Sequence, residues 1–474
     1  MSMPPPSRSL GSGLDFSHIK YGDKAKRFAA QSTLAREILI QKLQAFQEIK
    51  ALIKITFSER DRSSAAIWID ARSSPVKLLD SAPADNAEPS FELSWPPEKF
   101  EDLRDGREDP QTAVMMSAGS GGSKGNLPLA IRFADLITPD PTEPPQTADQ
   151  LDLNELPKPT EDIDQVKRDL RKWGYGLVTG APCCALLKNA LTTEQVAILK
   201  KGAQEQAAGE RKAGVATFDG GPKKPNQRIW NLFNKGEEFL DLLNHPLIDE
   251  VVPWYLGCDN PLLWSYSVNI ARPGGLPQVL HWDQGIMGHG RAKAVALNIS
   301  WLLCDFHEKN GGTRIFPGSH DKNVRPRNVF SSDGSIGCEA PAGTALIFEG
   351  RIWHGTGTNT ETSGERPCVL SLFTHPAVRP KENALLGLSW EVEDQLPERQ
   401  KSLAALRTGQ AGVGGALGEA REGIIIRRPR GDEHRPVGKV RAPHDDAEVE
   451  RLLLNGDHAN NEQSNVREAG GLDK

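Results

Sequence analysis

Three residues of this 474-residue chain have the types needed to hold an iron ion: His281, Asp283 and His354. Two imidazoles and one carboxylate on one face of an octahedral Fe(II) leave three positions open, which an oxygenase needs for a bidentate oxo acid and for dioxygen. In a β-strand, residues i and i+2 point to the same side, so His281 and Asp283 can converge while Trp282 faces away. His354 must then come from a distant strand. The sequence therefore predicts an iron site made of these three side chains.

An isolated His-x-Asp triplet is weak evidence, because short motifs of this kind occur by chance. The chain contains a second one, from His444 to Asp446, which lies in a charged stretch and is predicted to be solvated surface. His281, in contrast, lies between residues 266–271 and residues 295–303, two segments whose apolar alternation is typical of strands in a barrel wall. The flanking segments, rather than the triplet, favour a metal site at His281.

Residues from about 161 to 395 carry further landmarks in a fixed order. They are DLRKWGYGLVTG from residue 169, NIARPGG before QVLHWD, NGGTRIFPGSH at 310–320, PAGTALIFEGRIWHGTGTN at 341–359, and an arginine twelve residues after His354. This stretch resembles the phytanoyl-CoA dioxygenase group of Fe(II)/2-oxoglutarate-dependent oxygenases. The resemblance implies a double-stranded β-helix of the jelly-roll type with flanking helices.

The resemblance also implies a role for particular residues. His281, Asp283 and His354 match the iron ligands of the group, and Arg366 matches the cation that pairs with the distal carboxylate of 2-oxoglutarate. A planar guanidinium suits this task, because it forms two parallel hydrogen bonds to a carboxylate. The implied cofactors are Fe(II), 2-oxoglutarate and dioxygen, with ascorbate as a candidate reductant.

Gln278 and Thr313 match two further positions that hydrogen-bond the cosubstrate in this group. For Thr313 an alternative stays open, in which its hydroxyl only satisfies a turn.

The composition of the chain changes at two places. Prolines crowd residues 138–160 and forbid both helix interiors and central strands there, so this segment is predicted to be a linker. After about residue 408 the chain becomes polar and poor in aromatic residues. We therefore expect an N-terminal domain over 30–137, an oxygenase domain over 161–408 and a polar, mobile tail over 409–474.

The N-terminal domain shows the pattern of an α+β fold. Apolar residues recur at helical spacing, which predicts one amphipathic helix through Leu39, Leu43, Phe46, Ile49 and Ile53. Short strands are predicted near Ile67 and Phe91, helices from Pro96 and Pro110, and a final strand over 127–133. Strands and helices with apolar residues on one face predict a small layered structure.

The segment from Ser90 to Ile137 resembles the second half of a sterol carrier protein type 2 domain, most strongly from Asp109 to Ala130 with its DPQTA and KGN sequences. The resemblance covers about residues 30–137. It implies an apolar tunnel for fatty acyl chains or sterols. Met115 and Met116 are candidates to line such a tunnel, because thioethers adapt to variable apolar ligands, although an ordinary core position is the alternative.

Composition and charge exclude several classes of protein. The 57 basic and 63 acidic residues leave a net charge of -6, which argues against broad electrostatic binding of nucleic acid. No apolar run is long enough to span a membrane, and the N-terminus lacks the apolar core of a secretory signal. We expect a cytoplasmic protein, with a peroxisomal location suggested only by analogy with lipid enzymes.

Together these features predict an oxygenase that hydroxylates an unactivated C–H bond of a lipophilic small molecule of the fatty acyl, sterol or terpenoid type. In this hypothesis the N-terminal domain binds or delivers the lipid. Two alternatives remain open. One is a non-catalytic lipid-binding or transfer protein with an oxygenase-derived barrel, and the other is the same oxygenase chemistry leading to desaturation, epoxidation or rearrangement.

Overall fold

The computed structural model describes residues 24–59, 62–141, 143–179, 190–221, 223–287, 292–321, 324–406 and 438–455. The chain divides into two compact units, Met1–Pro139 and Asp140–Lys474. Residues 409–437 and 456–474 of the predicted mobile tail lie outside the described residues. Among the residues that are described, no helix has the length and apolar character needed to cross a bilayer.

The N-terminal unit is an α+β structure built on a mixed sheet. In the described residues, this sheet has the strand order β4-β3-β1-β5-β6, and β2 pairs with β1. Strands β1 and β5 run parallel, so the chain must cross over between them. The elements are α1 (Lys24–Lys42), η1 (Leu43–Ile49), β1 (Leu52–Glu59), β2 (Arg62–Ser63), β3 (Ile67–Asp70), β4 (Lys77–Leu79), β5 (Phe91–Trp95), α2 (Glu98–Arg104), α3 (Pro110–Gly119), β6 (Ser123–Gly125) and α4 (Leu127–Ile137).

Aromatic side chains hold the helices of this unit on its sheet. The rings of Phe46 and Phe133 lie 4.5 Å apart between centroids, and Phe91 of β5 lies 5.8 Å from Phe133. All three side chains are fully buried. Their contact joins η1, α4 and the sheet in one core.

Two of the predictions for this unit are wrong. Residues 127–133 form the helix α4 rather than a strand, because the Asn126 side chain caps it by accepting a hydrogen bond from Leu129 N, and Pro128 lies in the first turn. The predicted helical stripe does not continue to Ile53. Lys50 takes a left-handed conformation at φ 51° and ends the helical region, so Ile53 lies in β1.

The larger unit contains two antiparallel sheets. Within the described residues, one has the order β7-β14-β11-β16-β10-β9-β8 and the other the order β13-β12-β15. Its elements are η2 (Ala148–Gln150), α5 (Ile163–Trp173), β7 (Tyr175–Val178), α6 (Thr193–Lys212), β8 (Thr217–Asp219), β9 (Asn226–Ile229), η3 (Leu232–Asn234), α7 (Glu237–Leu242), α8 (Pro246–Leu256), β10 (Leu262–Ala271), α9 (Asp283–Ile286), β11 (Ala296–Leu302), β12 (Thr313–Ile315), β13 (Ile336–Gly337), β14 (Ala345–Glu349), β15 (His354–Thr356), β16 (Arg366–Thr374), α10 (Ala384–Gly387), α11 (Trp390–Gln395), α12 (Glu398–Leu403) and α13 (Asp446–Asn455).

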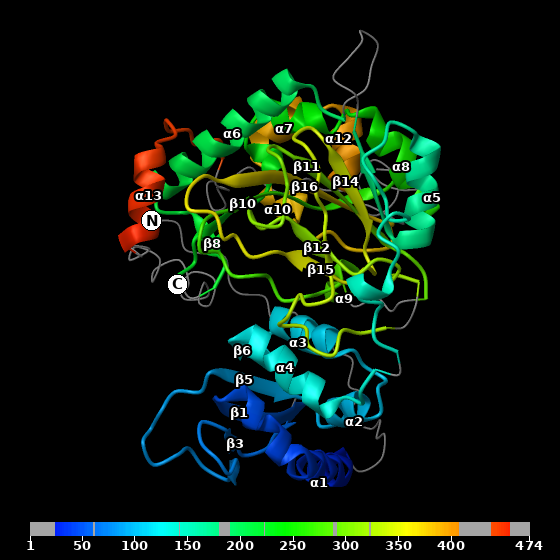
Figure 1. Cartoon of the computed structure of the whole chain (residues 1–474). Coiled ribbons are helices and arrows are strands. Elements are labelled where there is room, and N and C mark those ends of the chain that lie inside the picture. The colour runs from blue at the N-terminus through cyan, green and yellow to red at the C-terminus, as the bar shows by residue number, and fades with distance from the viewer. Residues whose placement is uncertain are drawn as a thin grey trace, which may run out of the picture. The chain divides into compact units, whose positions relative to one another are not determined.

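The two faces of the large sheet have different neighbours. Helices α6, α7 and α12 cover one face, and the small sheet with β12 and β15 lies on the other side (Figure 1). On the helical face, Tyr266 of β10 donates a hydrogen bond to the Phe239 carbonyl of α7 at 2.6 Å. Val268 and Ile270 share the core that β10 makes with these helices. Because strand residues alternate between faces, Ser267 and Asn269 point to the interior between the two sheets.

The strands that were predicted to flank the iron site are confirmed. Residues 266–271 fall within β10 and residues 295–303 contain β11. Both strands pair with β16, so the three strands form the centre of the large sheet. A sheet-rich unit of this kind agrees with the predicted class of fold.

Candidate metal centre

Backbone pairing brings His281 and His354 together although they are far apart in the chain. Each residue donates its N–H to the other's carbonyl at 2.9 Å, which forms an isolated antiparallel bridge. His354 begins β15, whereas Asp283 begins the one-turn helix α9. The prediction that His281 and Asp283 lie in one strand is therefore wrong, because Asp283 belongs to a helix. Trp282 between them is nevertheless extended, at φ -128° and ψ 125°, so both side chains still point to the same side.

The donor atoms of the three residues converge. The Nε2 atoms of His281 and His354 lie 3.6 and 3.8 Å from Asp283 Oδ1. One donor atom of each residue lies within 4.8 Å of the other two, and among the described residues this is the one group of three or more such side chains that can hold a metal ion. Two imidazoles and a carboxylate are the donors that a ferrous centre with open positions requires.

Hydrogen bonds fix the orientation of both imidazole rings. His281 Nδ1 bonds the Val279 carbonyl at 2.9 Å, and His354 Nδ1 bonds the Ile352 carbonyl at 3.1 Å. A carbonyl oxygen only accepts, so each Nδ1 carries the proton and each Nε2 keeps its lone pair for a metal. Burial, and then the neighbouring His354, lower the pKa of His281, which keeps its ring neutral near pH 7.

Asp283 is held by a residue that the sequence analysis did not identify. Asn298 of β11 donates from Nδ2 to Asp283 Oδ2 at 3.3 Å. This bond uses the carboxylate oxygen that faces away from the two histidines, because Oδ1 is the oxygen closest to them. Oδ1 is thereby left for a metal, and Asn298 of the large sheet orients the carboxylate.

Arg366 has the properties of a carboxylate receptor. It begins β16, its side chain is buried, and its guanidinium lies 4.6 Å from the centre of the Phe306 ring. Nη1 contacts Cys368 Sγ at 3.3 Å, whereas Nε and Nη2 are buried and have no hydrogen-bond partner in the described residues. A buried guanidinium with two free donors can bind an anion in a bidentate way, and leaving it without one is costly.

Further polar side chains lie on the interior face of the large sheet, near Arg366. Register places Asn269 opposite Cys368, two residues from Arg366 on the same face of β16, and Ser300 opposite Leu370. Asn269 Oδ1 and Ser300 Oγ are buried without a hydrogen-bond partner among the described residues. The sequence carried a signal for them, because Asn298 and Ser300 are polar residues at i and i+2 of an otherwise apolar strand.

Gln278 and Thr313 lie at the small sheet, next to the histidines. Gln278 Oε1 accepts hydrogen bonds from Thr356 N at 3.4 Å and from Thr356 Oγ1 at 3.3 Å. Thr313 of β12 lies directly opposite Thr356 of β15 in the register. Thr356 Oγ1 also accepts a hydrogen bond from Asn269 Nδ2 at 3.4 Å. Thr356, which the sequence analysis missed, is thus the residue that links these predicted positions to the large sheet.

The prediction that the second His-x-Asp triplet is solvated surface is wrong for His444 but holds for Asp446, whose side chain is 90% exposed. The His444 side chain is only 18% exposed, and its Nε2 lies 3.0 Å from Asp446 Oδ1 and 3.8 Å from Glu365 Oε2. Gln204 of α6 contacts the same imidazole at 3.4 Å. His444 therefore packs on the larger unit, against α6 and Glu365.

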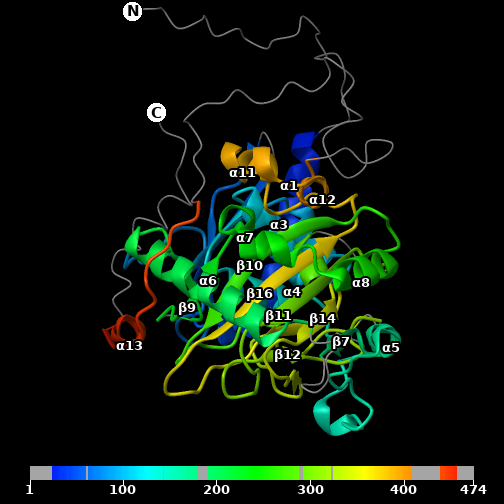
Figure 2. The same cartoon turned by 90° about the horizontal axis from the view of Figure 1, so that it is seen from above.

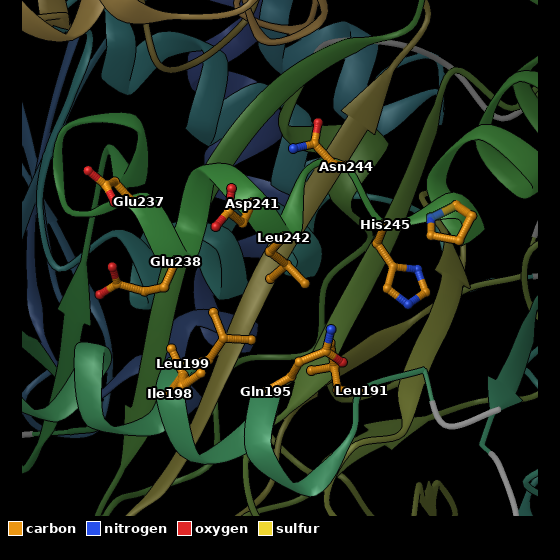
Figure 3. A pocket seen from close by; sticks show the side chains of 11 residues that line it. Leu191, Gln195, Ile198, Leu199, Glu237, Glu238, Asp241, Leu242, Asn244 and His245 are labelled. Carbon is orange, nitrogen blue, oxygen red and sulfur yellow. The ribbon is translucent and has the colours of Figure 1, made fainter. Parts of the chain in front are cut away.

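A cavity of about 530 Å³ also lies in this unit, outside the metal centre. Ile198 and Leu199 of α6 face Leu242 of α7 across it, and the carboxylates of Glu237 and Glu238 lie at one end (Figure 3). Its lining residues belong mainly to the helices on the outer face of the large sheet. It is therefore distinct from the interior that holds His281 and Arg366.

Comparison with known proteins gives a family match over the same region. Residues 184–368 match the family model of phytanoyl-CoA dioxygenase. Dioxygenase af480 of Aspergillus fumigatus is 31% identical over 208 residues, which are 43% of this chain and 66% of that protein. Dioxygenase ALT11 of Alternaria alternata is 37% identical over 151 residues, or 30% of this chain and 48% of that protein.

This chain spans about half to two thirds of the length of the curated relatives it matches. Among solved structures, the epimerase SnoN in complex with Fe3+, alpha ketoglutarate and nogalamycin RO is 18% identical, covering 55% of this chain and 96% of that one, with a TM-score of 0.37.

The family match includes all three metal-binding candidates and Arg366. Residues 184–368 are thus similar to phytanoyl-CoA dioxygenases, and with the donor set of His281, Asp283 and His354 this similarity supports an oxidoreductase of the dioxygenase class that uses Fe(II), 2-oxoglutarate and dioxygen.

Proposed function

We propose that this protein is an Fe(II)/2-oxoglutarate-dependent dioxygenase that hydroxylates an unactivated C–H bond of a lipophilic small molecule. The observation that carries the proposal is the convergence of three donor atoms within 4.8 Å, in the same interior as a buried guanidinium with two free donors. Iron with 2-oxoglutarate and dioxygen supplies the oxidising power when bound. His281, Asp283 and His354 hold it, and their hydrogen-bonded second atoms keep the set oriented.

Arg366 binds the distal carboxylate of 2-oxoglutarate in this proposal. Its Nε and Nη2 donors are free, and the Phe306 ring holds its plane in place. Ser300 lies on the same interior face, and its free hydroxyl can donate a hydrogen bond to an oxygen atom of the cosubstrate. Gln278 and Thr313 complete the proposed cosubstrate site. Gln278 accepts a hydrogen bond from Thr356, and Thr313 lies opposite Thr356 in the small sheet.

The side chain at position 283 favours hydroxylation. In this family, members that halogenate have a small residue there, which frees a coordination position for a halide. Asp283 instead supplies a carboxylate whose Oδ1 lies within 4 Å of both imidazole Nε2 atoms. Desaturation, epoxidation and rearrangement are the alternatives within the same chemistry, because the same iron site and cosubstrate can supply the oxidising power for each.

Release of succinate from 2-oxoglutarate under air with added Fe(II) tests this proposal. His281→Ala should abolish release through loss of the metal, and Arg366→Ala should strongly reduce it through weaker cosubstrate binding. Truncating one partner of a buried charge pair costs about 2 kcal/mol or more, so Arg366→Ala should weaken binding by at least about 30-fold. His307→Ala and Arg168→Ala are matched controls, because their side chains are 43% and 60% exposed. Succinate release that persists in His281→Ala would exclude this site as the iron centre. If the unaltered chain binds lipid but releases no succinate, the non-catalytic alternative holds.

We further propose that residues 30–137 form a lipid-binding domain of the sterol carrier type 2 kind, joined by the proline-rich residues 138–160 to an oxygenase domain over 161–408. The mixed sheet with helices α2 to α4 supports this proposal, and so does Met116, whose side chain is 49% exposed on α3. Tethering two binding modules raises their effective concentration to about the millimolar range for short linkers. The proposed substrate is therefore a fatty acyl, sterol or terpenoid compound.

Deletion of residues 1–139 tests lipid delivery. The cut must lie before residue 140, because Ala148 N bonds the Gly334 carbonyl at 2.8 Å and Thr160 pairs with Val178 in the larger unit. Delivery predicts a higher apparent KM for a lipid substrate and unchanged turnover of a small soluble one. An equal loss for both substrates would contradict it.

A further inference from the structure

Residues 438–451 of the C-terminal region lie along α6 and end in the first part of α13 (Figure 2). Val440 N donates to Gln206 Oε1 at 3.1 Å, and Ala442 N donates to the Glu205 carbonyl at 3.2 Å. Arg441 pairs with Glu238, at the end of the cavity of Figure 3, and donates to the Lys235 carbonyl at 2.7 Å. We refer to residues 438–451 as the docking segment.

Helix α6 has two glycines where the docking segment approaches it. A Cβ at Gly209 would lie 2.2 Å from the Val440 carbonyl oxygen, which is impossible without displacing the segment. Gly202, seven residues and about two turns earlier, accepts a hydrogen bond from Arg441 at its carbonyl. Each glycine inside a helix costs about 1 kcal/mol relative to alanine. The close approach of the docking segment explains why Gly209 is nevertheless there.

The docking segment ends on a buried carboxylate. His444 Nε2 lies 3.8 Å from Glu365 Oε2, and Gln204 Nε2 of α6 lies 3.4 Å from each of them. The Glu365 side chain is only 4% exposed. Burial alone would raise the pKa of Glu365, but Arg272 and then His444 and Gln204 outweigh burial and lower it. The docking segment thus covers Glu365 and helps to keep it charged.

Glu365 fixes the place from which Arg366 projects. Arg272 Nε donates to Glu365 Oε1 at 2.6 Å, and both side chains are more than nine-tenths buried. Arg272 follows Ala271, the register partner of Arg366, and Glu365 directly precedes Arg366. The ion pair therefore ties the end of β10 to the start of β16 at the residue pair that includes Arg366.

We infer that the docking segment is a positioning element for cosubstrate binding, and that His444 acts on Arg366 through Glu365 and Arg272. His444 closes the ion pair from the outside, and the ion pair holds the backbone of Arg366 so that Nε and Nη2 face the interior between the sheets. The inference rests on the proposed function. It assigns to the C-terminal region a role in the affinity for 2-oxoglutarate, separate from metal binding.

Calorimetric titration of 2-oxoglutarate into the full chain loaded with Mn(II) tests the inference without turnover. His444→Ala should weaken 2-oxoglutarate binding by about two- to five-fold, the range that corresponds to a weak, partly exposed polar contact. His444→Gln should restore most of the loss, because a glutamine side chain can still cover Glu365 and present a polar N–H group beside it. Glu450→Ala, an exposed position of α13, is the matched control and should bind like the unaltered chain. Mn(II) affinity should be the same in all four proteins.

Unchanged 2-oxoglutarate affinity in His444→Ala, beside normal binding by the unaltered chain, would contradict the inference alone. A loss that His444→Gln does not restore would also contradict it. No binding of 2-oxoglutarate by the unaltered Mn(II)-loaded chain would contradict the proposed function, and with it the inference.

Discussion

At the scale of single residues, Arg366 separates cosubstrate binding from metal binding. Its guanidinium can form two parallel hydrogen bonds to a carboxylate, whereas lysine offers a point charge. Arg366→Lys should therefore weaken 2-oxoglutarate binding by about 10-fold, equivalent to loss of one charge-assisted hydrogen bond. Metal binding should not change. Equilibrium titration measures both, and Arg168→Lys on the exposed face of α5 is the control.

Glu382 gives the fold a dependence on pH that is independent of the metal centre. Burial raises its pKa to about 7, although backbone groups of Tyr266 and Asn231 and the Ser265 hydroxyl oppose this. The pKa of Glu382 is about 7 in the folded protein and 4.5 in the unfolded chain. Its contribution to the free energy of unfolding is therefore fully present below about pH 4.5, where the carboxyl is neutral in both states. This contribution is lost as the pH rises through about 7. The loss amounts to about 3 kcal/mol.

Denaturant unfolding of Glu382→Gln at several pH values checks this. The variant should lose less free energy of unfolding between pH 5 and pH 8 than the unaltered chain does. Glu391→Gln, at an exposed position, should keep the original slope. Equal slopes in Glu382→Gln and the unaltered chain would contradict the assignment.

The sequence predicted the residues that carry recognisable chemistry better than those that support them. His281, Asp283 and His354 converge as predicted, since a metal centre needs particular residue types at particular spacings. Asn298 was missed although it alternates with Ser300 along an apolar strand, and Asn269 and Thr356 were missed because one amide or hydroxyl in a strand has no motif of its own. Their roles depend on which strands become neighbours, and only the sheet order decides that.

At the scale of elements, helix α6 is where packing and helix propensity compete. Gly209→Ala improves helix propensity by about 1 kcal/mol. The added Cβ would meet the Val440 carbonyl, so we expect a net destabilisation of about 1 to 2 kcal/mol and release of the docking segment. Limited proteolysis within residues 438–451 and thermal unfolding measure the two effects. Lys201 is 75% exposed on the same helix, so Lys201→Ala should change neither the proteolysis nor the thermal stability. A Gly209→Ala protein that is more stable and whose docking segment resists proteolysis would contradict the packing argument.

Strands in which apolar and polar residues alternate were predicted well, and elements decided by local capping were not. β10 and β11 were recognised because apolar residues alternate along them. Residues 127–133 looked like a strand because apolar residues crowd there, but the cap at Asn126 and the proline in the first turn start a helix. His444 was taken for a solvated residue because its partner Glu365 is far away in the sequence.

At the scale of the whole molecule, two compact units divide after Pro139. Scanning calorimetry should therefore show two transitions. A ligand stabilises only the unit that binds it, by about 2.7 kcal/mol at 100 times its Kd. Mn(II) with 2-oxoglutarate should raise the midpoint temperature of one transition and leave that of the other unchanged. Deletion of residues 1–139 should remove the transition whose midpoint does not change. A single transition that shifts as a whole would mean that the units do not unfold independently.

The most direct test of the central claim is an anaerobic titration with Fe(II), followed by addition of 2-oxoglutarate. If His281, Asp283 and His354 form one centre, the unaltered chain binds one Fe(II) and 2-oxoglutarate then produces a visible charge-transfer absorption. His354→Ala loses both signals, whereas His307→Ala keeps them. Equal iron binding by the unaltered chain and His354→Ala, or no iron binding by either, would contradict the account.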